Sequence, residues 1–306
     1  SETEIEATIG SARRKLAAVR ARRPQPARDE KILTAWNALM IKGLAIAARA
    51  LDRADLAAAA AAAADCIEER SWRDGRLYAV HAGDRARFPA YLDDHAFLAD
   101  ALLELLQTRW RARDWHRLIA LAEILLERFE DAQGGGFYFT ADGEETPLLR
   151  LKSFADESLP SGNGVAADVL LRLGYLAAEP RYLRAARRTL AAALPSMTSH
   201  PAAHMGLMNA LQCELETPRA VIIRGPPAQS AQWAHELQRA YAPGRLVLAI
   251  PAEETQLPRV FADKPAGADA PLAYLCVGTT CSAPFADFGA LLAALDERRA
   301  AATPAA

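Results

Sequence analysis

A repeat of about 60 residues constrains this chain more than any other feature. Tyr78 and Tyr138 occupy equivalent places in two short, glycine-bearing segments that lie 60 residues apart. Adjacent acidic residues also recur at intervals of 64 and 63 residues: Asp29-Glu30, Asp93-Asp94 and Asp156-Glu157. A repeat of this length, with two apolar helical segments in each unit, predicts helical hairpins that stack side by side to bury their apolar faces.

The spacing of apolar residues predicts seven long helices. We expect them at about 34–50, 54–69, after Asp94, around 118–129, after Ser161, after Pro180 and over 201–216. Thr34, Ser161 and Ser199 are candidate N-caps, because a side-chain oxygen there can accept a hydrogen bond from a free backbone N–H. The first part of the chain is therefore predicted to be mainly α.

The pattern changes near Thr217-Pro218. Two β-branched runs, at 220–224 and 246–250, flank a helical pattern over about 229–241, which predicts a parallel strand–helix–strand unit. Further candidates are a strand at 272–276 and a helix at 288–299. We therefore expect hairpin repeats over residues 1–217 and a small α/β subdomain over 218–306.

Composition restricts the possible partners and compartments. The 306 residues carry a formal net charge of -2, which does not indicate a nucleic-acid-binding surface. No apolar run approaches the roughly 20 residues that span a bilayer, and the N-terminus lacks the apolar core of a secretory signal. Four cysteines in a chain of this length do not form a disulfide scaffold. A cytoplasmic protein without membrane or nucleic-acid contacts is the expectation.

The acidic repeat is the main candidate for chemistry. If the helices that follow the acidic pairs begin at one end of the assembly, their carboxylates gather in one site. Paired carboxylates serve as acid and base when their environments separate their pKa values. Candidate catalytic residues are Asp29, Asp93, Asp94, His95 and Asp156. The alternative is that each acid only caps a helix and interacts favourably with its dipole.

Tyr91 to His95 is the densest titratable cluster in the sequence. His95 beside two carboxylates is a candidate proton shuttle near neutral pH. Alternatively, one aspartate caps the helix and His95 is merely exposed. No second set of His or Cys ligands has suitable spacing, so neither a metal nor a cofactor is expected.

Two further segments carry candidate substrate-binding residues. Arg28, Lys31, Trp36 and Asn37 combine charges with an aromatic ring that stacks on sugars and an amide that reads hydroxyl groups. Alternatively, the charges neutralise neighbouring acids and Trp36 is a core residue. Tyr91, in the acidic cluster described above, is another candidate for substrate binding. Ser161 and Asn163 lie in a glycine-rich stretch that matches neither a P-loop nor a dinucleotide-binding fingerprint. An ordinary helix cap at Ser161 explains much of this pattern.

Cys276 and Cys281 form a C-x4-C pair. A zinc site normally needs a second pair, which the sequence lacks. A reversible disulfide is one interpretation, and two unlinked thiols are another. Cys66 and Cys213 fall in predicted helices, where we expect them to be buried.

Several motifs together resemble a family of large thioredoxin-domain proteins of unknown function that includes spermatogenesis-associated protein 20. Residues 28–37 resemble its "RDDK-LT-WN" signature and residues 91–97 its "LDDYAF" motif. Residues 135–140 and 160–163 are similar to "GGYFFT" and "PSGN". Cys276 and Cys281 match its C-terminal cysteine pair. The motifs occur in the same order over nearly the whole chain.

The resemblance implies a thioredoxin-like domain fused to an α/α six-hairpin barrel shaped like N-acylglucosamine 2-epimerases and glycosidases. This sequence contains no thioredoxin-type Cys-x-x-Cys, so we expect it to correspond to the barrel part alone. Seven helices are too few for twelve, so we expect an incomplete toroid with an apolar flank that could support a homo-oligomer. This chain departs from the family at Asp29-Glu30 and over 156–164. Both departures fall at the expected site.

Two functions follow as hypotheses. The first is a carbohydrate-active pocket, isomerase-like or hydrolase-like, in which Trp36, Tyr91 and Asn163 hold the sugar while the carboxylates and His95 move protons. The second is a non-catalytic binding or redox-partner module for a thioredoxin-like domain, with disulfide exchange at Cys276 and Cys281. A purely structural role is a third possibility. Carboxylates consumed by caps and arginine pairs favour binding over glycoside chemistry.

Overall fold

The computed structural model describes residues 1–145 and 148–302, and side chains as far as Asp296. It divides into two compact units, residues 1–31 and residues 32–306. The predicted boundary at 217/218 falls where α8 ends at Leu215 and β5 begins at Arg219.

The N-terminal unit contains α1 (Glu2–Ala21), a helix for which the sequence analysis made no prediction. Ser1 caps it: Ser1 Oγ accepts a hydrogen bond from the Glu4 backbone N–H, and the Glu4 carboxylate accepts one from the N-terminal amine. Its apolar side chains are all exposed: Ile5, Ile9, Leu16 and Val19. These four residues are four, seven and three positions apart, which is the spacing of an apolar face on a helix, and this spacing could have predicted α1 from the sequence.

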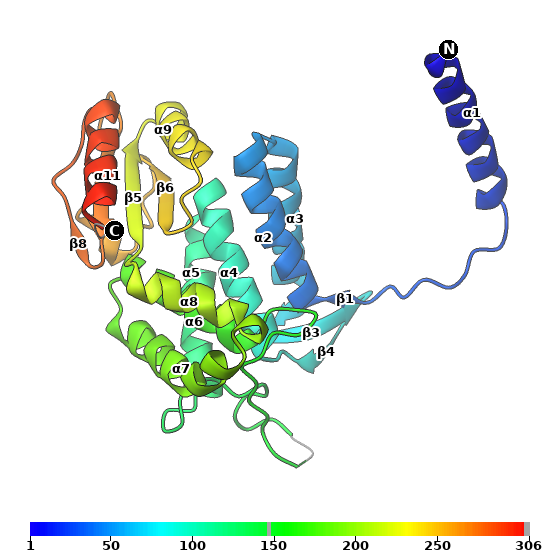
Figure 1. The fold of residues 1–306 in the computed structure, drawn as a ribbon, viewed down its shortest axis with the longest axis horizontal. Helices are drawn as coiled ribbons and strands as arrows, with labels where there is room; N and C mark the ends of the chain where they lie inside the picture. Colours follow the sequence, from blue (N-terminus) through cyan, green and yellow to red (C-terminus); the bar gives the residue numbers. More distant parts are fainter. Residues whose placement is uncertain (146–147, 303–306) are drawn as a thin grey trace. The chain divides into compact units, whose positions relative to one another are not determined.

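The helices of the second unit form hairpins, as predicted. They are α2 (Thr34–Leu51) with α3 (Ala54–Ser71), α4 (Leu92–Thr108) with α5 (Ala112–Ile124), and α6 (Gly162–Leu176) with α7 (Pro180–Ser199), followed by α8 (Met205–Leu215). A π-helical turn (Leu125–Phe129) extends α5. In Figure 1 these helices lie side by side, and contacts run successively from α2 to α4, from α4 to α6 and from α6 to α8. We call α2, α4, α6 and α8 the inner helices.

α4 is the centre of the helical core. All but two of its 17 residues are buried, because α2, α5 and α6 pack around it. The tightly packed positions include Phe97, Leu103 and Leu106, each with an exposed fraction of 1% or less. The burial of this helix fixes the position of its N-terminus, where the candidate residues lie.

A small antiparallel sheet adjoins the start of α2. It contains β1 (Ile32–Leu33), β2 (Trp72–Arg73), β3 (Arg76–Ala82) and β4 (Arg85–Pro89), with β3 paired to each of the others. The glycine-bearing segment around Tyr78 is therefore a β-hairpin. Its equivalent around Tyr138 forms one isolated bridge, between Glu130 and Phe137.

The second sheet has the order β6-β5-β7-β8. Its strands are β5 (Arg219–Gly225), β6 (Arg245–Pro251), β7 (Leu272–Val277) and β8 (Thr280–Cys281), accompanied by helices α9 (Pro227–Arg239), α10 (Arg259–Ala262) and α11 (Phe288–Ala302). β5 and β6 are parallel, as the strand–helix–strand pattern predicts, and β7 is antiparallel. Ile222 faces the helical core, whereas Val221 packs with Ala234 of α9.

Three helix starts differ from prediction. Thr34 is not an N-cap: its hydroxyl donates to the Tyr78 carbonyl at 2.7 Å. The third helix begins at Leu92, so the acidic pair lies inside its first turn. α8 follows a 3-10 turn (Pro201–Ala203) and has His204 as N-cap, so Ser199 is not its cap. The Ser161 cap is confirmed, with Oγ accepting from the Gly164 N–H at 2.9 Å.

The outer face of α2 exposes the predicted apolar flank. Trp36 and Met40 are each 61% exposed, Leu51 is 66% exposed and Ile46 is 42% exposed. Burial instead falls on the opposite face, at positions such as Ile41. The fold is therefore mainly α, with hairpins arranged as expected for part of an α/α toroid, and it carries a small α/β subdomain.

Candidate functional site

The N-termini of the inner helices meet through two carboxylates that act as clamps. Asp94 is 4% exposed, and its Oδ1 accepts a hydrogen bond from the Ala35 N–H of α2 at 2.9 Å. Its Oδ2 accepts from the Tyr91 N–H at 2.9 Å. Burial raises the pKa of Asp94 to about 6, against the effect of these two bonds. The side chain therefore joins the start of α2 to the start of α4.

Asp156 performs the same task one repeat later. Its Oδ1 accepts from the Ser161 N–H at 2.8 Å, and its Oδ2 accepts from the Gly206 N–H of α8 at 2.8 Å. The start of α6 is thereby joined to the start of α8. The capping alternative is correct for Asp94 and Asp156, because each accepts hydrogen bonds from backbone N–H groups at the starts of two adjacent inner helices.

Asp93 differs from both clamps. It is partly buried, and its carboxylate has no hydrogen-bond partner among residues 1–145 and 148–296. The carboxylate lies against the first residue of α6, because a Cβ built on Gly162 would be 2.2 Å from Asp93 Oδ1. Burial, together with the charge of Asp94, raises the pKa of Asp93 to about 6. The positive end of α6 favours the ionised form, so both protonation states are accessible near neutral pH.

His95 is not the exposed residue of the alternative interpretation, and its position does not suit a proton shuttle. It is 5% exposed, its Nδ1 donates to the Tyr91 carbonyl at 2.8 Å, and its ring lies 4.9 Å from that of Phe129. Burial lowers the pKa of His95 to about 4. The imidazole is therefore neutral at pH 7 and holds the first turn of α4.

The predicted residues of the first acidic segment belong to the N-terminal unit. Arg28 and Asp29 are exposed there, as is Lys31. Arg28 Nε pairs with Glu30 at 2.7 Å, and Lys31 Nζ pairs with Asp29 at 2.9 Å. These pairs match the alternative in which the basic residues neutralise neighbouring acids, so the acid of this repeat is not one of the clamps.

Of the predicted sugar-holding groups, Trp36 is exposed and Tyr91 is partly exposed, whereas the amides of Asn37 and Asn163 donate to backbone carbonyls. Trp36 is exposed, which contradicts its assignment to the core. The Tyr91 ring stacks on Phe139, with centroids 4.8 Å apart. Asn37 Nδ2 donates to the Leu33 carbonyl at 2.9 Å, closing the first turn of α2.

Asn163 is 1% exposed and its amide is fully engaged. Oδ1 accepts from the Phe137 N–H at 2.7 Å, while Nδ2 donates to the carbonyls of Phe137 and Ser153, each at 2.9 Å. The predicted role of Asn163 in holding a polyol is therefore wrong: it fixes the loop before α6. Ser161 is occupied as the α6 cap.

A buried ion network, which the sequence analysis missed, links three inner helices. Arg172 of α6 pairs with Asp100 and Glu104 of α4 and with Asp168 of its own helix. Lys42 and Arg49 of α2 complete the network, through Asp100 and Glu104 respectively. Burial opposes the charge of Glu104, but the arginines hold its pKa low, at about 2. Asp168 and Arg172 are four residues apart, a spacing that is common for ion pairs on helix surfaces. The sequence therefore gives no sign that this pair is buried in a network.

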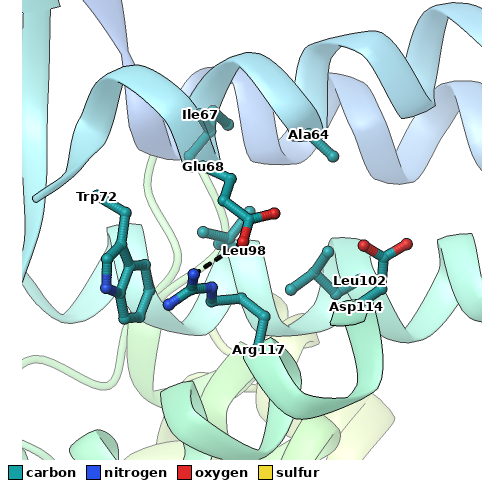
Figure 2. A pocket seen from close by; sticks show the side chains of 8 residues that line it. All are labelled: Ala64, Ile67, Glu68, Trp72, Leu98, Leu102, Asp114 and Arg117. Carbon is teal, nitrogen blue, oxygen red and sulfur yellow. Dashed lines mark hydrogen bonds and ion pairs between the residues drawn. The ribbon is translucent and has the colours of Figure 1, made fainter. Parts of the chain in front are cut away.

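A narrow pocket lies between α3, α4 and α5, away from the residues singled out in the sequence. Figure 2 shows its lining: Ala64, Ile67, Glu68, Trp72, Leu98, Leu102, Asp114 and Arg117. Arg117 pairs with Glu68 at 2.8 Å, and its guanidinium lies 3.9 Å from the centre of the Trp72 ring. These contacts occupy the charged groups with one another, so the pocket is better explained by packing than by ligand binding.

The cysteines complete the comparison with the expected sites. Cys276 and Cys281 form a disulfide, so the interpretation as unlinked thiols is wrong. Cys66 and Cys213 are only partly buried. Within the described residues, no three His, Cys, Asp or Glu side chains are placed to hold a metal ion, and no helix is long and apolar enough to cross a membrane.

Comparisons with known proteins confirm the sequence resemblance. No family model matches the chain. Spermatogenesis-associated protein 20 of Rattus norvegicus is 30% identical over 234 residues, which cover 73% of this chain and 30% of that protein. The Homo sapiens protein of the same name is 28% identical over 305 residues, covering 92% of this chain and 38% of that protein. The chain thus spans well under half the length of these relatives.

Among solved structures, cellobiose 2-epimerase from Spirochaeta thermophila is similar with a TM-score of 0.45 and 17% identity, over 56% of this chain and 46% of that chain. D-mannose isomerase is similar with a TM-score of 0.41 and 16% identity, over 53% of this chain and 42% of that chain. With TM-scores below 0.5, these likenesses carry no argument about function. The sequence similarity identifies the family: the chain is a homologue of spermatogenesis-associated protein 20, and it matches about a third of that protein's length.

Proposed function

We propose that the starts of α2, α4 and α6 bind a sugar or a similar polyhydroxylated molecule, and that Asp93 exchanges a proton with it. One observation carries the proposal. Of the three aspartates at these helix starts, Asp93 alone is free, because Asp94 and Asp156 are held by two backbone N–H groups each. Its pKa of about 6 makes it both a competent base and a competent acid near neutral pH.

The surroundings of Asp93 suit a hydroxylated ligand. Tyr91 and Phe139 form a stacked aromatic pair at the start of α4, where the Leu92 N–H donates to the Phe139 carbonyl at 2.9 Å. Trp36 is exposed one residue after Ala35, which is itself bonded to Asp94. Aromatic faces pack against the apolar faces of sugar rings, while a carboxylate accepts hydrogen bonds from their hydroxyl groups.

A single free carboxylate favours proton transfer over hydrolysis. Glycoside hydrolysis normally uses two carboxyl groups that flank the scissile bond. Here Asp94 and Asp156 are held by backbone N–H groups, which leaves Asp93 to remove and return a proton. The reaction class that fits is isomerisation or epimerisation next to a carbonyl, in which a base takes a proton from carbon and the same or another acid returns it.

Ligand-induced stabilisation tests the binding step. A ligand that binds only the folded state raises the melting temperature by mass action. The chain is screened against monosaccharides, disaccharides, sugar phosphates and amino sugars. Asp93→Asn should abolish the shift, while Asp84→Asn, the same change at an exposed turn position, should retain it.

Solvent exchange tests the chemical step. With a binding sugar in D₂O, proton NMR should show deuterium entering at the carbon next to the carbonyl for the wild type and for Asp84→Asn, but not for Asp93→Asn. Binding without exchange would leave a sugar-binding module and remove the catalytic part of the proposal. The absence of any melting-temperature shift with a folded chain would contradict the proposal, and it would favour a non-catalytic module that binds another kind of partner.

A further inference from the structure

The disulfide between Cys276 and Cys281 occupies a position that a structural cross-link does not need. The two residues face each other directly across the β7–β8 hairpin, in the same register as Val277 and Thr280. Gly278 makes the turn with a φ of 60°. The bridge therefore closes a loop of only a few residues, and closing so short a loop restricts the unfolded chain little.

Backbone contacts hold the hairpin whether or not the sulfurs are joined. The Ser282 N–H donates to the Leu275 carbonyl at 2.9 Å, and the Leu275 N–H donates to Ser282 Oγ at 3.2 Å. Ala273 and Phe285 exchange two further hydrogen bonds, of 3.0 and 2.8 Å. On its other edge, β7 pairs with β5 over six residues. Reduction would therefore leave two thiols facing each other, ready to be reoxidised.

The two cysteines differ in accessibility. Cys276 is 7% exposed and packs in the core beside Ala220 and Ile222, whereas Cys281 is exposed on the edge strand β8. Thiolate attack on a disulfide requires approach to one sulfur along the bond axis. Solvent gives such an approach at Cys281 and protein covers Cys276. An exposed attacked cysteine with a buried partner is the arrangement that supports directed exchange.

We propose that Cys276 and Cys281 form a thiol–disulfide exchange site whose co-reactant is a dithiol and whose attacked atom is the Sγ of Cys281. One thiolate of the co-reactant attacks Cys281 Sγ, and Cys276 leaves as a thiolate that takes a proton. The second thiol of the co-reactant, after losing its proton, attacks its own sulfur in the mixed disulfide and releases the Cys281 thiolate. Two electrons and two protons pass to the chain, and the dithiol becomes a disulfide.

The remaining cysteines lie outside the C-terminal sheet. Cys66 and Cys213 lie in α3 and α8, partly buried. Burial, with a contribution from the charge of Asp168, raises the pKa of Cys213 to about 12, so its thiolate is scarce at neutral pH. The site is independent of the proposed sugar site, since it lies in the C-terminal sheet and shares no residue with the helix starts.

Reversible reduction of the folded chain is the first test. Under native conditions, excess dithiothreitol followed by iodoacetamide should place adducts on Cys276 and Cys281 that are absent without dithiothreitol, as located by peptide mass spectrometry, while circular dichroism still shows a cooperative melting transition. Oxidised dithiothreitol should restore the bridge and block alkylation. Reduction that occurs only together with unfolding, or a bridge that resists dithiothreitol until the chain is denatured, would overturn the proposal.

The second test separates the two sulfurs. The Cys281 thiol in Cys276→Ser should form a mixed disulfide with oxidised glutathione at least about tenfold faster than the Cys276 thiol in Cys281→Ser. Equal rates, or faster reaction at Cys276, would overturn the assignment of the attacked sulfur. Wild-type chain alkylated after reduction provides the same comparison without a substitution, through the relative rates of the two adducts.

Discussion

The carboxylate of Asp93 occupies the space that a side chain at Gly162 would fill: a Cβ there would lie 2.2 Å from Asp93 Oδ1. The second residue of α4 and the first residue of α6 are thus fitted to each other. The relationship explains why α6 begins with glycine, and it places a partly buried acid at the positive end of a helix.

Gly162→Ala should therefore displace Asp93 and destabilise the chain by about 1–3 kcal/mol, because the methyl group overpacks the contact. Gly43→Ala is the matched control: a Cβ added to this helical glycine would have no neighbouring atom within 4 Å. Alanine should raise stability there by roughly 0.4–1 kcal/mol. Denaturant unfolding measures both, and two stabilising substitutions would contradict the contact.

Asp93 should make the chain less stable as pH rises from about 4 to about 6. Burial, with the charge of Asp94, raises the folded-state pKa of Asp93 to about 6, above its unfolded value near 4. The folded state therefore binds the proton more tightly, and that advantage is lost as pH passes the folded pKa. Asp93→Asn should gain stability relative to wild type over this window, by up to roughly 3 kcal/mol.

Comparing wild type with Asp93→Asn separates the effect of the Asp93 carboxyl group from that of other groups that also make the free energy of unfolding depend on pH. Asp94 has a raised pKa and contributes in the same direction, whereas buried His95, with a lowered pKa, contributes in the opposite direction. Urea unfolding of both proteins at pH 4, 5, 6 and 7 provides the difference. A difference that is constant with pH would show that Asp93 has an ordinary pKa.

Arg172 should be far more costly to remove than a surface arginine. Arg172→Met leaves Asp100, Glu104 and Asp168 buried with less counter-charge, and we expect a loss of about 3–5 kcal/mol. Arg181→Met is the control, since Arg181 is half exposed and pairs with surface acids, and it should cost about 1 kcal/mol or less. Similar losses from both substitutions would mean that the network is not buried as described.

The two faces of α2 should respond differently to substitution. Ile41 is completely buried and Met40 is 61% exposed, although they are neighbours in sequence. Ile41→Ala should cost about 2–5 kcal/mol, whereas Met40→Gln should change stability by no more than roughly 0.5 kcal/mol. Thermal unfolding measures both. A large loss at Met40 would show that the apolar flank is covered in solution, which light scattering would reveal as self-association.

The sequence predicts the hairpins well because their apolar spacing is local information. The repeat of acidic residues also pointed to the correct end of the inner helices, through Asp94 and Asp156. What each acid does depended on contacts between repeats. Asp93 and Asp94 are adjacent, and a helix turns about 100° per residue, so one contacts α2 and the other α6. No local pattern distinguishes which of the two is held and which is free.

Other errors have the same origin. Thr34 has the residue type of an N-cap, but its hydroxyl is taken by Tyr78 of the neighbouring sheet. Asn163 has the right chemistry for a polyol, yet three backbone groups of the preceding loop occupy its amide. In both cases tertiary partners satisfy a polar group that the sequence analysis assigned to another role.

The most direct test of the account is the titration of the Asp93 side chain itself. Carbon-13 NMR of the aspartate carboxyl groups, with Asp93→Asn used to assign the resonance, gives its pKa in the folded chain. The expected pKa of Asp93 is about 6, because the carboxylate is partly buried, unpaired and next to Asp94. A value at or below 4 would show a solvated or paired carboxylate, and it would contradict the role of Asp93 as the proton-exchanging group.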